Sequence, residues 1–149
     1  GEIHSFGSKQ RPVRTRSTNG QNFQNFLILK STQNISLQGL WIDNANLPIE
    51  ILAGTPTISG AALLGAFNAI TISGSARPLI KDSLVSGAQA SGVIISGQAQ
   101  PILKGNQFAN NEPFHLQNGS NYEVDVRDNK FSPGASATTL LGQFKYEEQ

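Results

Sequence analysis

The chain has 149 residues, 38% of them hydrophobic, which fits a single domain over residues 1–149. A net charge of +1 argues against a dedicated nucleic-acid binder, and the lack of cysteine excludes disulfides and thiolate zinc sites. No apolar run has the roughly 18 residues of a membrane span, so membrane insertion is not expected.

The first feature along the chain is a group of cations close to the N-terminus. The group consists of Lys9, Arg11, Arg14 and Arg16. Arg14 and Arg16 would lie on one face of a strand, and such a face could bind an anionic glycan or a phosphate. A solvated basic face or tail is the favoured interpretation.

From about residue 12 to residue 132 the chain repeats with a period near 22. The six-residue segments 37–42, 58–63, 80–85, 103–108 and 126–131 align in register. Their first column is Leu37, Ile58, Ile80, Leu103 and Val126, and their sixth is Ile42, Leu63, Val85, Phe108 and Phe131. Their third column contains only Gly or Asp. A fixed period with turn residues in register is typical of a solenoid.

A second set of apolar pairs with i, i+2 spacing lies between these segments. The pairs are Leu27/Leu29, Ile49/Ile51, Ile70/Ile72, Val93/Ile95 and Phe114/Leu116. This spacing puts both side chains on one face of a strand. We therefore expect an all-β, single-stranded right-handed parallel β-helix of five to six coils. The segment 133–149 is off register and is expected to form a C-terminal cap, while a β-sandwich is the alternative fold.

The repeats resemble those of the pectin-lyase-like superfamily of right-handed parallel β-helix proteins. The resemblance rests on residues 76–87, 91–97 and 99–111, on an internal asparagine at Asn106 and Asn129, and on the opening phrase 34–44. It covers roughly residues 25–132. It implies the fold, and since lyases, hydrolases, adhesins and recruiting domains share the repeat, it leaves the function open.

One exposed charge recurs with the repeat. Lys81, Lys104 and Arg127 each follow the first inward residue of a coil, so they should point outward and stack about 4.8 Å apart. Stacked cations attract anions and lower one another's pKa. A solvated face, neutralised by Asp82 and Asp128, is the plainer interpretation.

Three further residue types bear on function. Trp41 should face outward and is the best candidate for stacking on a sugar ring. Asn106 and Asn129 should form a ladder that bonds the backbone of adjacent coils. His4 and His115 have no metal-type partner in the sequence, so surface or incidental roles are expected and no metal site is predicted.

The favoured function is a non-catalytic extracellular domain, secreted or on a cell surface. It would bind a polysaccharide or another surface ligand through Lys81, Lys104, Arg127 and Trp41, or serve as a structural part of a larger protein. One alternative is a lyase acting on an acidic glycan with Lys81, Lys104 and Arg127 as base and carboxylate neutraliser. Another is a protein-recruiting domain. No cofactor is expected, except calcium for a lyase, and the open ends of the β-helix could support homo-oligomers.

A hydrolase is disfavoured. Its two carboxylates should lie about 5 Å or 6.5–9.5 Å apart. Asp82 and Asp128 share a column but are two coils, roughly 10 Å, apart.

Overall fold

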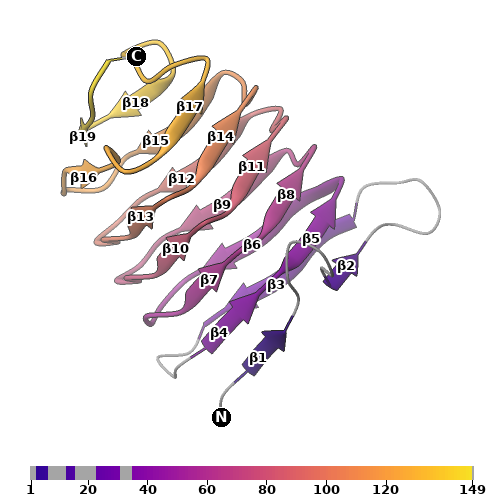
Figure 1. The fold of residues 1–149 in the computed structure, drawn as a ribbon. Helices are drawn as coiled ribbons and strands as arrows, with labels where there is room; N and C mark the ends of the chain where they lie inside the picture. The colour runs from indigo at the N-terminus through magenta and orange to yellow at the C-terminus, as the bar shows by residue number, and fades with distance from the viewer. Residues whose placement is uncertain (1–2, 7–12, 16–22, 31–34, 149) are drawn as a thin grey trace.

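The computed structural model describes the backbone of residues 3–6, 13–15, 23–30 and 35–148, with side chains from residue 27 onward. Every pairing between its strands is parallel, and the strands stack in about five turns of a β-solenoid (Figure 1). No helix occurs among the described residues. The expected parallel solenoid is confirmed.

Each of the first five turns contributes one strand to each of three sheets. The first sheet contains β1 (Ile3–Phe6), β4 (Ile35–Gln38), β7 (Thr57–Ser59), β10 (Leu79–Lys81) and β13 (Ile102–Lys104). The second contains β2 (Val13–Thr15), β5 (Leu40–Asp43), β8 (Ala62–Leu64), β11 (Leu84–Ser86), β14 (Gln107–Ala109) and β17 (Lys130–Ser132). The third contains β3 (Phe23–Leu29), β6 (Ala45–Ile51), β9 (Asn68–Ile72), β12 (Ser91–Ile95), β15 (Phe114–Asn118) and β18 (Leu140–Gly142).

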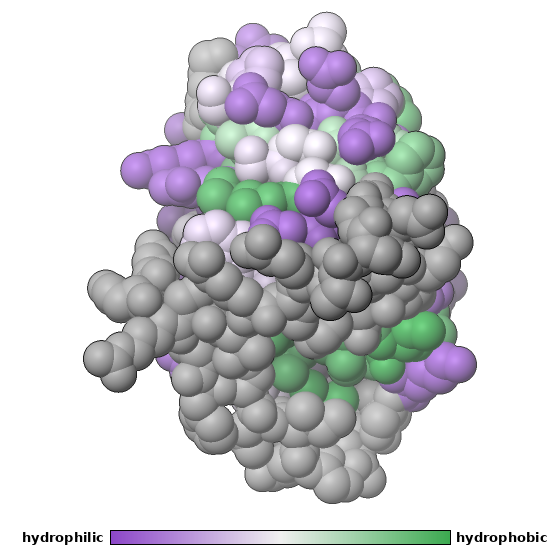
Figure 2. All heavy atoms as spheres, turned by 90° about the vertical axis from the view of Figure 1, so that its right-hand side faces the viewer, coloured by the Kyte–Doolittle hydropathy of each residue, from purple (hydrophilic) through white to green (hydrophobic). Residues whose placement is uncertain are grey.

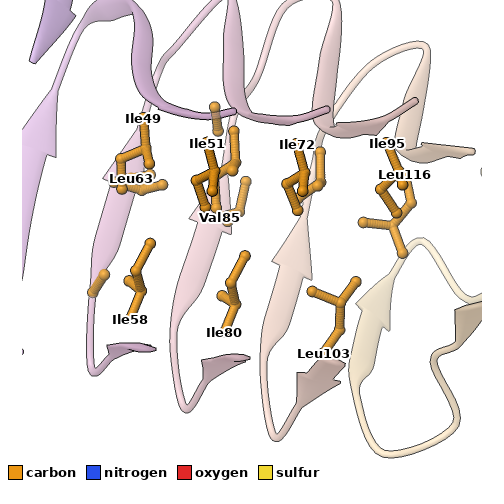
Figure 3. Close-up of a cluster of buried hydrophobic side chains, with 14 of the residues drawn as sticks. Ile49, Ile51, Ile58, Leu63, Ile72, Ile80, Val85, Ile95, Leu103 and Leu116 are labelled. Atoms are coloured by element: carbon orange, nitrogen blue, oxygen red, sulfur yellow. The ribbon is translucent and has the colours of Figure 1, made fainter. Parts of the chain in front are cut away.

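The core is built from the inward columns that the repeat predicts. Ile58, Ile80 and Leu103 are register partners in the first sheet, and all are buried. Figure 3 shows how these side chains face those of the other sheets inside the solenoid. Phe108 and Phe131 stack with ring centroids 5.2 Å apart, as the shared column predicts. Because each inward residue packs on its equivalent in the next turn, stability depends on neighbouring turns.

One predicted pair is out of place in the fifth turn. Leu116 is the register partner of Val93, but the partner of Ile95 is Asn118, and Phe114 instead aligns with Ser91. The prediction that Phe114 and Leu116 form the inward pair is therefore wrong by two residues, because the inward pair is Leu116 and Asn118. The second inward position of this turn is taken by Asn118, a buried polar residue that a pattern of apolar pairs does not reveal.

The C-terminal segment continues the parallel stacking. Its strand β18 pairs with β15, and β19 (Phe144–Lys145) pairs with β16 (Val124–Asp125) in a separate two-stranded sheet. The segment expected to be off register thus adds β18 to the third sheet and β19 to β16, both in parallel register.

Candidate functional site

The predicted site residues lie on two adjoining faces of the solenoid. Lys81 on β10 and Lys104 on β13 are register partners in the first sheet. Both point outward, because their neighbours Ile80 and Leu103 are buried. Trp41 lies on β5, in the second sheet, and also points outward between buried Leu40 and Ile42. The adjacent lysines and the outward tryptophan agree with the sequence prediction.

Arg127 differs from the two lysines in being neutralised by a neighbour. Its Nη2 atom donates to Asp125 Oδ2 at 2.8 Å, and its Nε donates to Asp125 Oδ1 at 3.0 Å. These bonds lower the pKa of the Asp125 carboxyl to about 2, while the carboxylate raises the pKa of Arg127. The partner that neutralises Arg127 is therefore Asp125, and the unpaired part of the basic column reduces to Lys81 and Lys104.

The surroundings of Arg127 carry both signs of charge. A shallow groove of about 420 Å³ there is lined by Ile102, Leu103, Lys104, Asp125, Arg127, Asp128 and Glu147. Carboxylates and cations alternate along this lining. Such a mixed surface has no strong preference for an anion.

A second groove, of about 250 Å³, lies beside Trp41. We call it the Trp41 groove. Its described lining residues are Leu40, Trp41, Gly60, Ala61, Ala62, Leu64, Asp82, Ser83, Leu84, Gly105 and Gln107. The lining is mainly apolar, with Asp82, Ser83 and Gln107 as its polar side chains. Neither lysine is in this lining, although Lys81 and Lys104 directly precede Asp82 and Gly105 in the chain.

The register of the second sheet explains the hollow. Trp41 pairs with Ala62, Ala62 with Leu84, and Leu84 with Gln107. These four side chains thus form one outward column, in which the small Ala62 lies between the large Trp41 and Leu84. With a strand spacing of about 4.8 Å, the two large residues begin roughly 10 Å apart. A hollow of one strand's width remains between them.

The bend between the first and second sheets forms one side of the Trp41 groove. Gly60, Asp82 and Gly105 occupy this bend in consecutive turns with φ of 60°, 51° and 67°. This left-handed conformation suits glycine and is tolerated by Asp, which accounts for the residue types at these three positions. Two glycines without side chains keep the bend open beside Ala62.

The indole ring of Trp41 is oriented by its neighbour. Its Nε1 donates to Asp43 Oδ1 at 3.0 Å, and both residues are outward on β5. Arg14 on β2 is the backbone register partner of Trp41 on the opposite edge of β5. The other N-terminal cations, Lys9, Arg11 and Arg16, and the side chain of His4 lie outside the described part of the chain.

The asparagine ladder is confirmed. Asn106 Oδ1 accepts from the Ser83 amide at 3.1 Å, and Asn129 Oδ1 accepts from the Asn106 amide at 3.0 Å. The Asn106 side chain also donates to the Ile80 carbonyl at 2.9 Å. These residues are buried and belong to the framework, not to a ligand site.

The prediction of a surface role for His115 is wrong. The side chain is fully buried and has hydrogen-bond partners on both ring nitrogens, Asn111 and Pro133. An isolated histidine in a sequence gives no sign of such partners, because Asn111 belongs to no motif with it and Pro133 lies 18 residues further along the chain. Among the described residues, no three His, Asp or Glu side chains gather in a way that could hold a metal ion.

The sequence prediction also missed most of the Trp41 groove. The period does not single out Ala62, Leu84 and Gln107, because their outward column has a different residue type in each turn. The signal was present in the strand alternation, since each lies one position before a buried core residue.

No described segment is a helix with the length and hydropathy to span a membrane.

Comparison of the chain with protein-family models, with curated proteins and with solved structures gives no match. The class of protein that the structure defines is therefore a parallel β-solenoid of about five turns. The likeness to the pectin-lyase-like superfamily rests on the repeat alone.

Proposed function

We propose that this chain is a carbohydrate-binding domain without catalytic activity, which holds a sugar ring against Trp41. The observation that supports the proposal is the Trp41 groove, where an indole and an open hollow share one outward column with polar groups at its edge. By this proposal the protein acts at a cell surface or in the extracellular space and needs no cofactor.

The chemistry of the groove suits a pyranose. One face of a sugar ring carries C–H groups that pack on an indole, while its rim carries hydroxyls that need donors and acceptors. Ala62 and Leu84 continue the apolar floor, and the carboxylate of Asp82 and the amide of Gln107 lie along the edge. Ligand sites commonly combine such an apolar surface with a few polar groups that fix orientation.

Figure 2 shows one face of the molecule, on which the described residues are coloured by hydropathy. Hydrophobic residues reach the coloured part of this surface in patches separated by hydrophilic ones. Large apolar areas usually mark protein interfaces, whereas a sugar needs an area of about one or two rings.

Lys81 and Lys104 have a secondary role in the proposal. They lie on the adjoining face next to the bend, and would contact the carboxylates of a glycan chain that extends beyond the groove. A lyase built on the same column would need a third cation or a metal to neutralise the charge of the substrate carboxylate. Arg127 is already bonded to Asp125, which favours binding without turnover.

The experiment exploits the single tryptophan of the chain. Neutral and acidic oligosaccharides are titrated while Trp41 fluorescence is followed, and binding is measured independently by calorimetry. We expect Trp41→Ala to abolish binding, while Ile102→Ala, which removes an exposed side chain outside the groove, leaves it unchanged. The double change Lys81→Ala with Lys104→Ala should weaken acidic glycans only, in a salt-dependent way.

Two results would contradict the proposal. Full binding by Trp41→Ala would show that the groove is not the site. Release of an unsaturated product, followed by its ultraviolet absorbance and lost on Lys104→Ala, would show that the protein is a lyase.

A further inference from the structure

His115 connects the end of the solenoid to the turn beneath it. Its Nε2 lies 2.8 Å from the Pro133 carbonyl oxygen, in the segment that follows β17. Its Nδ1 lies 3.2 Å from Asn111 Nδ2, and its ring lies 5.6 Å from that of Phe131. One buried imidazole thus joins the turn before β15 to the start of the last segment.

The orientation of Asn111 fixes the proton on this imidazole. Asn111 Oδ1 accepts from the Ala88 amide at 3.0 Å, and Asn111 Nδ2 donates to the Val85 carbonyl at 3.0 Å. Exchanging the oxygen and nitrogen of the amide would break both bonds. The second Nδ2 hydrogen therefore points to His115 Nδ1, which must be the unprotonated acceptor. The proton is on Nε2 and is donated to Pro133.

The imidazolium form does not fit this site. A proton on Nδ1 would face the N–H of Asn111, and the charge would be buried without a counter-ion among the described residues. The bond from Nε2 to the Pro133 carbonyl would remain, so the cost is relieved only when the ring reaches water, which requires the segment bonded over it to move. The ionisable residues on the elements packed around His115 are Glu112 before β15 and Lys130 on β17, and both are exposed. Burial lowers the pKa of His115, and the Pro133 carbonyl offsets part of this effect.

The segment held by His115 is the one that closes the last turn. It begins at Pro133, is folded by the bond from Thr139 Oγ1 to the Gly134 carbonyl at 2.9 Å, and leads into β18 and β19. The His115 amide also donates to the Thr139 carbonyl at 2.8 Å. Loosening this segment would uncover the edges of β15 and β16, to which β18 and β19 are paired.

We propose that His115 is an acid-sensitive latch, whose protonation releases the C-terminal segment 133–148 from the end of the solenoid. The released state exposes the edges of β15 and β16, which β18 and β19 cover at neutral pH, so these two edges become available for pairing at acid pH. The latch is independent of the Trp41 groove, which lies on earlier turns.

The test is hydrogen–deuterium exchange of the full chain between about pH 7.5 and about pH 5, corrected for the intrinsic pH dependence of exchange. Peptides from 133–148 should lose protection by up to about tenfold for each pH unit below 6.5, the ordinary pKa of histidine. Peptides covering β9 and β12 should not change. His115→Gln should remove the pH response, and His4→Gln should retain it.

A second measurement does not depend on whether His115→Gln folds. The nitrogen chemical shifts of His115 in the unmodified chain should report a neutral ring protonated on Nε2 at about pH 7.5. The second proton should bind at a lower pH than it does in a free histidine. An imidazolium at neutral pH would overturn the proposal. Equal protection of 133–148 at both pH values, with His115 protonated at the lower one, would also overturn it.

Discussion

Replacement of Asn106 by Ala tests whether the asparagine ladder holds adjacent turns together. The side chain is fully buried and accepts from the Ser83 amide while donating to the Ile80 carbonyl and to Asn129 Oδ1. Alanine removes all three bonds. The Ser83 amide is then left as a buried donor without its partner, which costs about 1–3 kcal/mol, and the lost bond to the Ile80 carbonyl adds about 0.5–1.5 kcal/mol. Because Asn129 Oδ1 keeps the Asn106 amide as donor, its lost bond adds little, and we expect a total loss of about 1.5–4.5 kcal/mol.

The measurement is the free energy of unfolding from urea denaturation. Gln107→Ala is the matched control, because Gln107 is the next residue, is exposed, and should change stability by less than about 0.5 kcal/mol. Asn106→Asp keeps the shape but replaces the two amide hydrogens with a carboxylate oxygen beside Ile80 O and Asn129 Oδ1. It should be at least as destabilising as Ala at neutral pH. A loss below about 1 kcal/mol for Asn106→Ala would refute the ladder as a stabilising element.

Two other predictions follow from local geometry. Gly92→Ala should destabilise the protein by about 1–3 kcal/mol, because the new Cβ would collide with the main-chain oxygen of His115; Gly119→Ala, where the nearest atom is 3.7 Å away, is the control in the same denaturation assay. The carboxyl of Asp125 should titrate near pH 2 in a carbon-detected NMR experiment, and Arg127→Gln should return its pKa toward the ordinary 3.8. Since the folded pKa is the lower one, the contribution of this pair to stability is present above about pH 3.8 and is lost as the pH falls toward 2. An Asp125 pKa that is the same with and without Arg127 would contradict the pairing.

The sequence predicts the framework well because the same physical demand recurs in each turn. Ile58, Ile80 and Leu103 stack on one another, so each must be apolar and of similar size, and the demand is visible as a column. The bend has a left-handed residue in four consecutive turns, at Gly39, Gly60, Asp82 and Gly105, which favours Gly and Asp in this column; Asp128 in the last turn is not left-handed.

Where a buried position has a different residue type in each turn, the repeat does not predict which residue fills it. The buried position next to Ile70, Val93 and Leu116 is taken by Ala69, then Gly92, then His115. Gly92 lacks the Cβ that would collide with the main-chain oxygen of His115 and crowd the Asn111 side chain, so the turn above requires a residue without a side chain at this position. No period reveals such a compensation between unlike residues. The inward pair of the fifth turn, Leu116 and Asn118, keeps the register of Val93 and Ile95, but the polar Asn118 hides it from a search for apolar pairs.

The candidate binding site differs from the core in that its residues do not repeat from turn to turn. An outward residue has no partner across the solenoid to match, so a repeating outward column is not needed for stability. The column Trp41, Ala62, Leu84 and Gln107 changes size and polarity at each turn, and the hollow exists because it does so. The repeated basic column shows the limit of reading function from the period, since its third member Arg127 is engaged by Asp125, two residues away. In a solenoid of this kind, a ligand site is therefore better sought where an outward column departs from the repeat, and Trp41→Ala against Lys81→Ala with Lys104→Ala is the comparison that decides between the two columns.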